Sequence, residues 1–214
     1  MDFLPGQAVI IAFSLAAVVV TLAPGPDMTL FVSRTLSQGR RAGIVSFIGA
    51  ITGVLVHTLF AALGLSALLA ASATAFSVLK IVGALYLLWL AIDAILNGSA
   101  LDVSENHANP QRLGRVFLTG VGINLLNPKI VLFFVTFLPQ FVSADDPDAA
   151  AKMTFLGVYF IAIAVPICFA IIFAADRIAH TVKRSPSVMR IMDWLLASVF
   201  AGFAVRLLFE PNRN

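Results

Sequence analysis

Long apolar stretches alternate with short groups of charged residues along this chain. The charged groups lie at residues 34–41, 102–115, 145–152 and 176–190. A helix needs about 20 apolar residues to cross a hydrocarbon core roughly 30 Å thick. Cutting the chain at its charged groups therefore predicts an all-α integral membrane fold of six spans. These are Leu4 to Val32, Gly43 to Ala70, Ala73 to Leu96, Val116 to Val142, Met153 to Ala175 and Ile191 to Phe209.

Composition supports the membrane assignment. Hydrophobic residues make up 60% of the chain and charged residues only 12%, whereas soluble domains carry about 25% charged residues. We expect one transmembrane domain over residues 1–214. The net charge of +3 comes from basic residues in short loops, so it indicates membrane orientation and no nucleic-acid partner. The single cysteine, Cys168, lies in an apolar run and offers neither a disulfide nor a CxxC metal site.

Basic residues in short loops predict the orientation, because such loops resist translocation. If the amino terminus is outside, the outer loops hold only Lys152 and Arg213, near an acidic segment at 145–148. An even number of spans then places both termini outside, in the periplasm. The predicted inner loops hold the other basic residues: Arg34, Arg40, Arg41, Arg112, Arg115, Arg177, Lys183, Arg184 and Arg190.

The first and fourth spans carry similar proline motifs. Span one reads TLAPGPDMTLF from Thr21 and span four reads NLLNPKIVLFF from Asn124, so that Pro26 aligns with Pro128 at an offset of 102 residues. Each half then contains three spans, which inverts the second half relative to the first. We expect two inverted repeats, at about 1–98 and 110–214, joined by a polar loop at 97–115.

The prolines predict broken helices. Pro24, Pro26 and Pro128 each remove an amide donor and clash with the preceding turn, and Gly25 adds backbone freedom. Irregular backbone at membrane depth survives only when it is buried in protein or lines a wet cavity. A helix that restarts after proline also presents free amides and a positive dipole end, which suit a carboxylate. The breaks therefore indicate the transport path.

Each break carries one charged residue. Lys129 opposes the helix dipole and costs about 2.5–3.5 kcal/mol at the bilayer centre, which requires a visiting anion or a permanent acidic partner. Asp27 is one such partner, although an acid in the first turn also stabilises the dipole with no ligand. Together the two charges match a zwitterion with one ammonium and one carboxylate.

Three polar residues are further candidates near the breaks. Asn124 and Asn127 lie three residues apart, on one helical face, where their amides either bind ligand or cap the loosened backbone. His57 shares a face with Gly49 and Gly53, whose GxxxG spacing predicts a helix interface within the chain or between copies. His57 is a candidate proton relay, with packing as the alternative.

Other signals limit the function. Asp93 is a second relay candidate, although snorkelling near a span end also explains it. The chain has no HExxH, P-loop or GxSxG motif, so we expect neither an enzyme nor an ATPase, and no cofactor. Transport must then draw on an ion gradient or on the gradient of the substrate itself.

Several motifs occur together at characteristic spacing: APGPD at 23–27, GRRAG at 39–43, LKIVGALYLLWLA at 79–91, and NLLNPK with FFVTFLPQF at 124–141. In this combination the chain resembles the LysE/RhtB family of amino-acid exporters over its whole length. The resemblance implies a bacterial inner-membrane protein of six helices that exports amino acids such as lysine, homoserine, threonine or leucine by proton antiport. The proline motifs of the family map onto Pro24, Gly25, Pro26, Asn127 and Pro128.

The substrate class stays open among several readings. Acids at membrane depth are few, so a neutral amino acid is favoured over a basic one. Alternatives are another small solute, or a metal ion, which needs several acids, histidines or cysteines around the path. A non-transporting scaffold is a third reading, but it does not explain paired broken helices with opposite charges.

Overall fold

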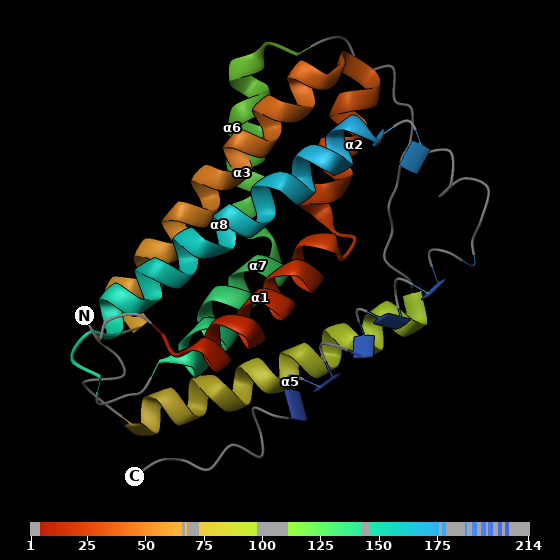
Figure 1. Ribbon diagram of the computed structural model, residues 1–214. Coiled ribbons are helices and arrows are strands. Elements are labelled where there is room, and N and C mark those ends of the chain that lie inside the picture. The colour runs from red at the N-terminus through yellow and green to blue at the C-terminus, as the bar shows by residue number, and fades with distance from the viewer. Residues whose placement is uncertain are drawn as a thin grey trace.

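The structure is a computed structural model. It describes residues 5–65, 73–97, 111–142 and 146–175, together with isolated positions at 67 and between 177 and 205. The elements in this part of the chain are helices (Figure 1). Only isolated positions of the predicted sixth span are described, and most of the predicted inter-repeat loop lies outside the described residues.

The first expected span is two helices. α1 (Gln7–Leu22) and α2 (Pro26–Gln38) meet at an angle of 49°. Pro26 opens α2, where its missing amide proton costs nothing. α2 runs past the expected end at Val32 to Gln38. It is followed by Gly39, whose φ of 84° lies in the left-handed region that favours glycine.

The fourth expected span is broken in the same way. α6 (Leu113–Leu126) and the segment Pro128–Phe141 meet at 52° across Asn127. That segment begins as α7 (Pro128–Leu132) and continues as a π-helical turn, η2 (Phe133–Phe137), and a 3₁₀ turn, η3 (Leu138–Phe141). Pro139 cannot donate to the carbonyl four residues back, which explains why the regular α-helix does not continue here.

The other described helices match expected spans. α3 (Arg40–Phe60) continues into a π-helical turn, η1 (Ala61–Leu65). α5 (Ala73–Asn97) covers the third expected span and α8 (Ala149–Phe173) the fifth. Among the described residues, two helices are long and apolar enough to cross a membrane, or four if each bent pair counts as one span. The full six-span arrangement stays a prediction.

α3 and α6 lie side by side in close contact (Figure 1). A β-carbon added at Gly49 would lie 2.3 Å from the carbonyl oxygen of Phe117, and one at Gly120 would lie 2.2 Å from that of Ser46. Small residues allow helix backbones to approach this closely. The GxxxG face of α3 is therefore used inside the chain.

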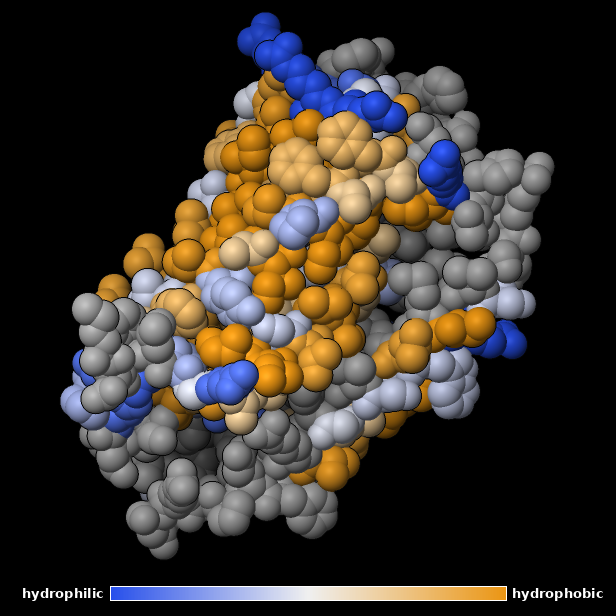
Figure 2. Space-filling view, viewed as in Figure 1, coloured by the Kyte–Doolittle hydropathy of each residue, from blue (hydrophilic) through white to orange (hydrophobic). Residues whose placement is uncertain are grey.

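Apolar side chains also cover the outside of the helices. Figure 2 shows a broad apolar band across one face, with the most hydrophilic residues toward the ends of the helices. Large exposed side chains include Leu15, Phe60 and Leu118, which are 66%, 70% and 66% exposed. Such a surface suits lipid and is rare on a soluble monomer.

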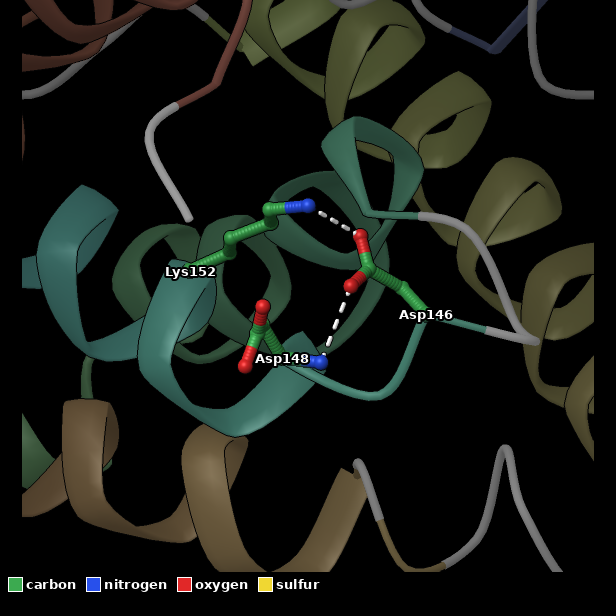
Figure 3. A network of polar contacts seen from close by, with 3 residues as sticks. All are labelled: Asp146, Asp148 and Lys152. Atoms are coloured by element: carbon green, nitrogen blue, oxygen red, sulfur yellow. Dashed lines mark hydrogen bonds and ion pairs between the residues drawn. The ribbon is translucent and has the colours of Figure 1, made fainter. Parts of the chain in front are cut away.

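The start of α8 is organised by charged residues. The side chain of Asp146 accepts hydrogen bonds from Lys152 Nζ and from the backbone amide of Asp148 (Figure 3). The bond from Lys152 is the main reason that the pKa of the Asp146 carboxyl lies below its ordinary value. α8 begins at Ala149, slightly before the expected Met153, because this local network extends the helix into the polar segment.

Candidate functional site

The two helix breaks lie against each other. Asp27, in the first turn of α2, extends toward the second break, where its Oδ2 accepts hydrogen bonds from Nδ2 of Asn124 and Nδ2 of Asn127, both at 2.9 Å. Asp27 is 8% exposed, and the two asparagines are 2% and 1% exposed. A buried carboxylate costs free energy unless hydrogen bonds or a cation offset it. The two amides supply part of that compensation.

Lys129, in the first turn of α7, extends toward the first break. Its Nζ donates to the carbonyl oxygen of Ala23 at 2.8 Å. Ala23 follows the last residue of α1, where free carbonyls give the helix end a partial negative charge. A β-carbon at Gly25 would lie 3.1 Å from Lys129 Nζ, so the glycine provides the space that the ammonium occupies.

Each charged residue therefore contacts the opposite break, and the two charges do not contact each other. Among the described residues, no ion pair joins Lys129 Nζ to the Asp27 carboxylate. Instead, a backbone carbonyl satisfies the ammonium and two side-chain amides satisfy the carboxylate. The direct pairing that the sequence suggested as one alternative is not the arrangement of this conformation.

Asn127 also caps α7. Its Oδ1 accepts a hydrogen bond from the backbone amide of Lys129 at 3.1 Å, and Pro128 occupies the first helical position. This is the capping alternative for Asn127. The same side chain thus stabilises the second break and binds the acid of the first.

Two buried oxygens at this site have no hydrogen-bond partner. They are Oδ1 of Asp27 and Oδ1 of Asn124. Buried polar atoms in folded proteins are nearly always hydrogen-bonded, so each exception needs an explanation. A ligand or a proton that enters here would find two free acceptors.

His57 lies next to the site from α3. Its Nε2 is 3.4 Å from the carbonyl oxygen of Asn124, a long and weak contact. The ring stacks on Phe134 at a centroid distance of 5.8 Å. A β-carbon at Gly53 would lie 2.5 Å from Asn124 Oδ1, so the same face of α3 also holds Asn124 in place.

The remaining residues lie at different places relative to the crossing. Asp93 is on α5, is partly exposed, and is not among the residues lining the cavity at Asp27. Thr21 lines the cavity, and its hydroxyl donates to the carbonyl of Ala17 within α1. Pro24 and Gly25 form the unwound link between α1 and α2.

A small cavity adjoins the crossing, with about 50 Å³ of room for the centres of water molecules. That volume holds a few waters. Its polar lining is Thr21, Asp27, Asn124 and Lys129. Its apolar wall comes from α1, α2, α3, α7 and α8 and includes Phe31, Phe47, Ala50, Phe160, Ala164 and Cys168.

The apolar wall is the part of the site that the sequence did not reveal. Phe160, Ala164, Cys168 and Ile171 line the cavity from α8 at intervals of three or four residues, which is one helical face. That spacing is visible in the sequence, but any buried helix of a bundle shows a similar face. Among the described residues, no group of three or more histidines, cysteines or acids is placed to hold a metal ion.

Comparison with known proteins gives a consistent result. Residues 18–211 match the family described as LysE type translocator. The homoserine/homoserine lactone efflux protein of Salmonella typhimurium is 31% identical over 189 residues, which cover 88% of this chain and 90% of the relative. An uncharacterized membrane protein of Vibrio cholerae is 34% identical over 200 residues, which cover 92% of this chain and 95% of the relative. No solved structure matches. The chain therefore belongs to the LysE type translocator family of membrane transport proteins.

Proposed function

We propose that this protein exports amino acids across the bacterial inner membrane in exchange for protons, with both termini in the periplasm. The family supports a transporter, and the Salmonella relative is named for the efflux of homoserine and its lactone. The charge pattern of the short loops supports the orientation. The similar angles of the two breaks, 49° and 52°, support two inverted repeats.

The arrangement of Asp27 and Lys129 at the crossed breaks is the observation that carries this proposal. A carboxylate and an ammonium line one buried cavity and are held apart by separate partners. An amino-acid zwitterion carries the two complementary charges. The substrate ammonium binds Asp27 and Asn124. The substrate carboxylate binds Lys129 and the backbone amides near Gly25 and Asn127, at the amino-terminal, positive ends of α2 and α7.

A flux assay tests this site. Inside-out vesicles, or cells fed dipeptides, are supplied with labelled homoserine, threonine, leucine and lysine, with and without a protonophore. We expect protonophore-sensitive flux in the wild type and a loss of about ten- to a hundredfold in Asp27→Asn, because a hydrogen bond to a charged group contributes about 1.5–3 kcal/mol. Asp148→Asn is the matched control, since Asp148 is exposed at the start of α8.

Each other result has a definite meaning. Undiminished flux in Asp27→Asn removes this site from the path. Absence of flux for every amino acid in the wild type favours another small solute or the scaffold reading. His57 and Asp93 remain proposed relays, and His57→Phe and Asp93→Asn in the same assay separate relay from packing by their effect on protonophore sensitivity.

The apolar wall supports a neutral substrate. A second charge on the substrate side chain would lie among residues such as Phe31, Phe160 and Cys168 without a partner, which is costly. We expect Ala164→Leu, which narrows the cavity, to lower leucine flux by about tenfold or more while homoserine flux falls less, because overpacking costs about 1–3 kcal/mol. Ala162→Leu on the exposed face of α8 is the control. Equal losses for both substrates would contradict this role.

A further inference from the structure

The two unpartnered oxygens at the crossing belong to groups that already touch. Asn124 Nδ2 donates to Asp27 Oδ2 at 2.9 Å, and the free atoms are the other oxygen of each group, Asp27 Oδ1 and Asn124 Oδ1. An ionised carboxylate and an amide oxygen are both acceptors, so they cannot bond to each other. A buried acceptor without a donor is unfavourable. Within the protein, the two oxygens therefore lack one shared hydrogen.

A single proton supplies that hydrogen for both atoms. The geometry points to a proton carried on Asp27 Oδ1 and donated to Asn124 Oδ1, which makes this carboxyl–amide pair the proton-binding site of the protein. Asp27 Oδ1 shares a carbon with Oδ2, and Asn124 Oδ1 shares a carbon with Nδ2. The two free oxygens therefore approach each other when the carboxyl group and the amide group are coplanar. In that arrangement the carboxyl and the amide form a ring with two hydrogen bonds, one donated by each group.

None of the surrounding charged and titratable groups hydrogen-bonds the oxygen that carries this proton. Lys129 Nζ from α7 is held by the Ala23 carbonyl, so protonation of Asp27 breaks no ion pair among the described residues. His57 from α3 faces the backbone carbonyl of Asn124, and the thiol of Cys168 lines the cavity from α8. Neither group hydrogen-bonds Asp27 Oδ1. Asp27 can therefore gain and lose a proton while Lys129 remains in place.

This site also explains exchange, a step that rests on the proposed function. The ammonium of an amino acid donates hydrogen bonds to the same two oxygens and requires an ionised carboxylate. The proton must therefore leave Asp27 for water before the zwitterion binds, and it must return from water when the zwitterion leaves. No covalent bond of the substrate changes. One proton crosses against each amino acid, and because the zwitterion is neutral, the cycle moves one positive charge.

Infrared spectroscopy of the purified protein in nanodiscs tests the proton directly, without any substrate. A protonated carboxylic acid has a carbonyl band that shifts in heavy water. We expect this band in the wild type at neutral pH, its loss in Asp27→Asn and its retention in Asp148→Asn. In Asn124→Leu the band should move to higher frequency, because the acid loses its acceptor. Gel filtration verifies that each variant is folded. If Asp27→Asn does not fold, Asp27→Glu, which keeps an acid, takes its place.

The outcomes separate the proton site from the transport function. A wild-type spectrum that matches Asp27→Asn shows an ionised Asp27 and overturns the proton site, and so does a band that Asn124→Leu leaves unmoved. Addition of L-homoserine should remove the band and release one proton per bound molecule to a pH dye. A wild type that shows the band but moves no amino acid supports the proton site and overturns the proposed function.

Discussion

Lys129→Met should lower amino-acid flux by roughly tenfold to over a hundredfold while the protein remains folded. The substitution keeps the length of the apolar stem and removes the charge that the second break presents to the cavity. A hydrogen bond to a charged group contributes about 1.5–3 kcal/mol, and the substrate carboxylate loses this partner. The Ala23 carbonyl loses its donor as well. Initial rates of labelled homoserine flux, at matched expression, measure the effect.

Two further variants sharpen this test. Lys152→Ala removes a lysine that contacts Asp146 at the start of α8, and it should leave flux unchanged. Lys129→Arg keeps the positive charge, but the guanidinium is broader than the ammonium and does not fit the space beside Gly25. A β-carbon added at Gly25 would already lie 3.1 Å from Lys129 Nζ. Full activity in Lys129→Met would show that the substrate carboxylate binds elsewhere.

Gly120→Ala should destabilise the protein, whereas Gly122→Ala on the same helix should stabilise it. The added β-carbon at Gly120 would lie 2.2 Å from the carbonyl oxygen of Ser46, so α3 and α6 would have to separate. Overpacking of this kind costs about 1–3 kcal/mol. At Gly122 no atom lies within 4 Å of the added carbon, and the gain in helix propensity is about 0.4–1 kcal/mol.

Thermal unfolding in detergent measures this pair of variants. A change of 1–3 kcal/mol corresponds to a fall in the melting temperature of roughly 2–12 °C for a chain of this size. Two variants with the same small effect would show that α3 and α6 can move apart freely, which contradicts the close contact. Opposite signs would show that this contact limits stability.

The positions of the breaks could be predicted from the sequence, because proline removes an amide donor wherever it occurs. Pro26 and Pro128 each open a new helix, as expected. The charged groups were a less exact guide to helix ends. Arg34 marks the edge of the apolar stretch, yet α2 continues to Gln38. A helix continues as long as the backbone keeps helical conformation, whatever the polarity of its side chains, and that conformation ends at Gly39.

The partners of the two charges could not be predicted. From the side chains alone, the opposite charges of Asp27 and Lys129 at matching repeat positions favour an ion pair. The carbonyl of Ala23 becomes available only because α1 ends there, and a free backbone group leaves no trace in the residue types. The GxxxG spacing likewise predicted a close helix contact but not that Asn124 lies against Gly53.

The hydrogen bonds across the breaks also constrain how the protein is made. Asp27 lies 97 residues before Asn124 and 100 before Asn127, its two hydrogen-bond donors. At about 5–20 residues per second, the ribosome needs roughly 5–20 s to synthesise that intervening stretch. Throughout this interval Asp27 lacks both of these partners, because they have not yet been synthesised. Maturation of the first broken helix is therefore completed only after the second half has been delivered to the membrane.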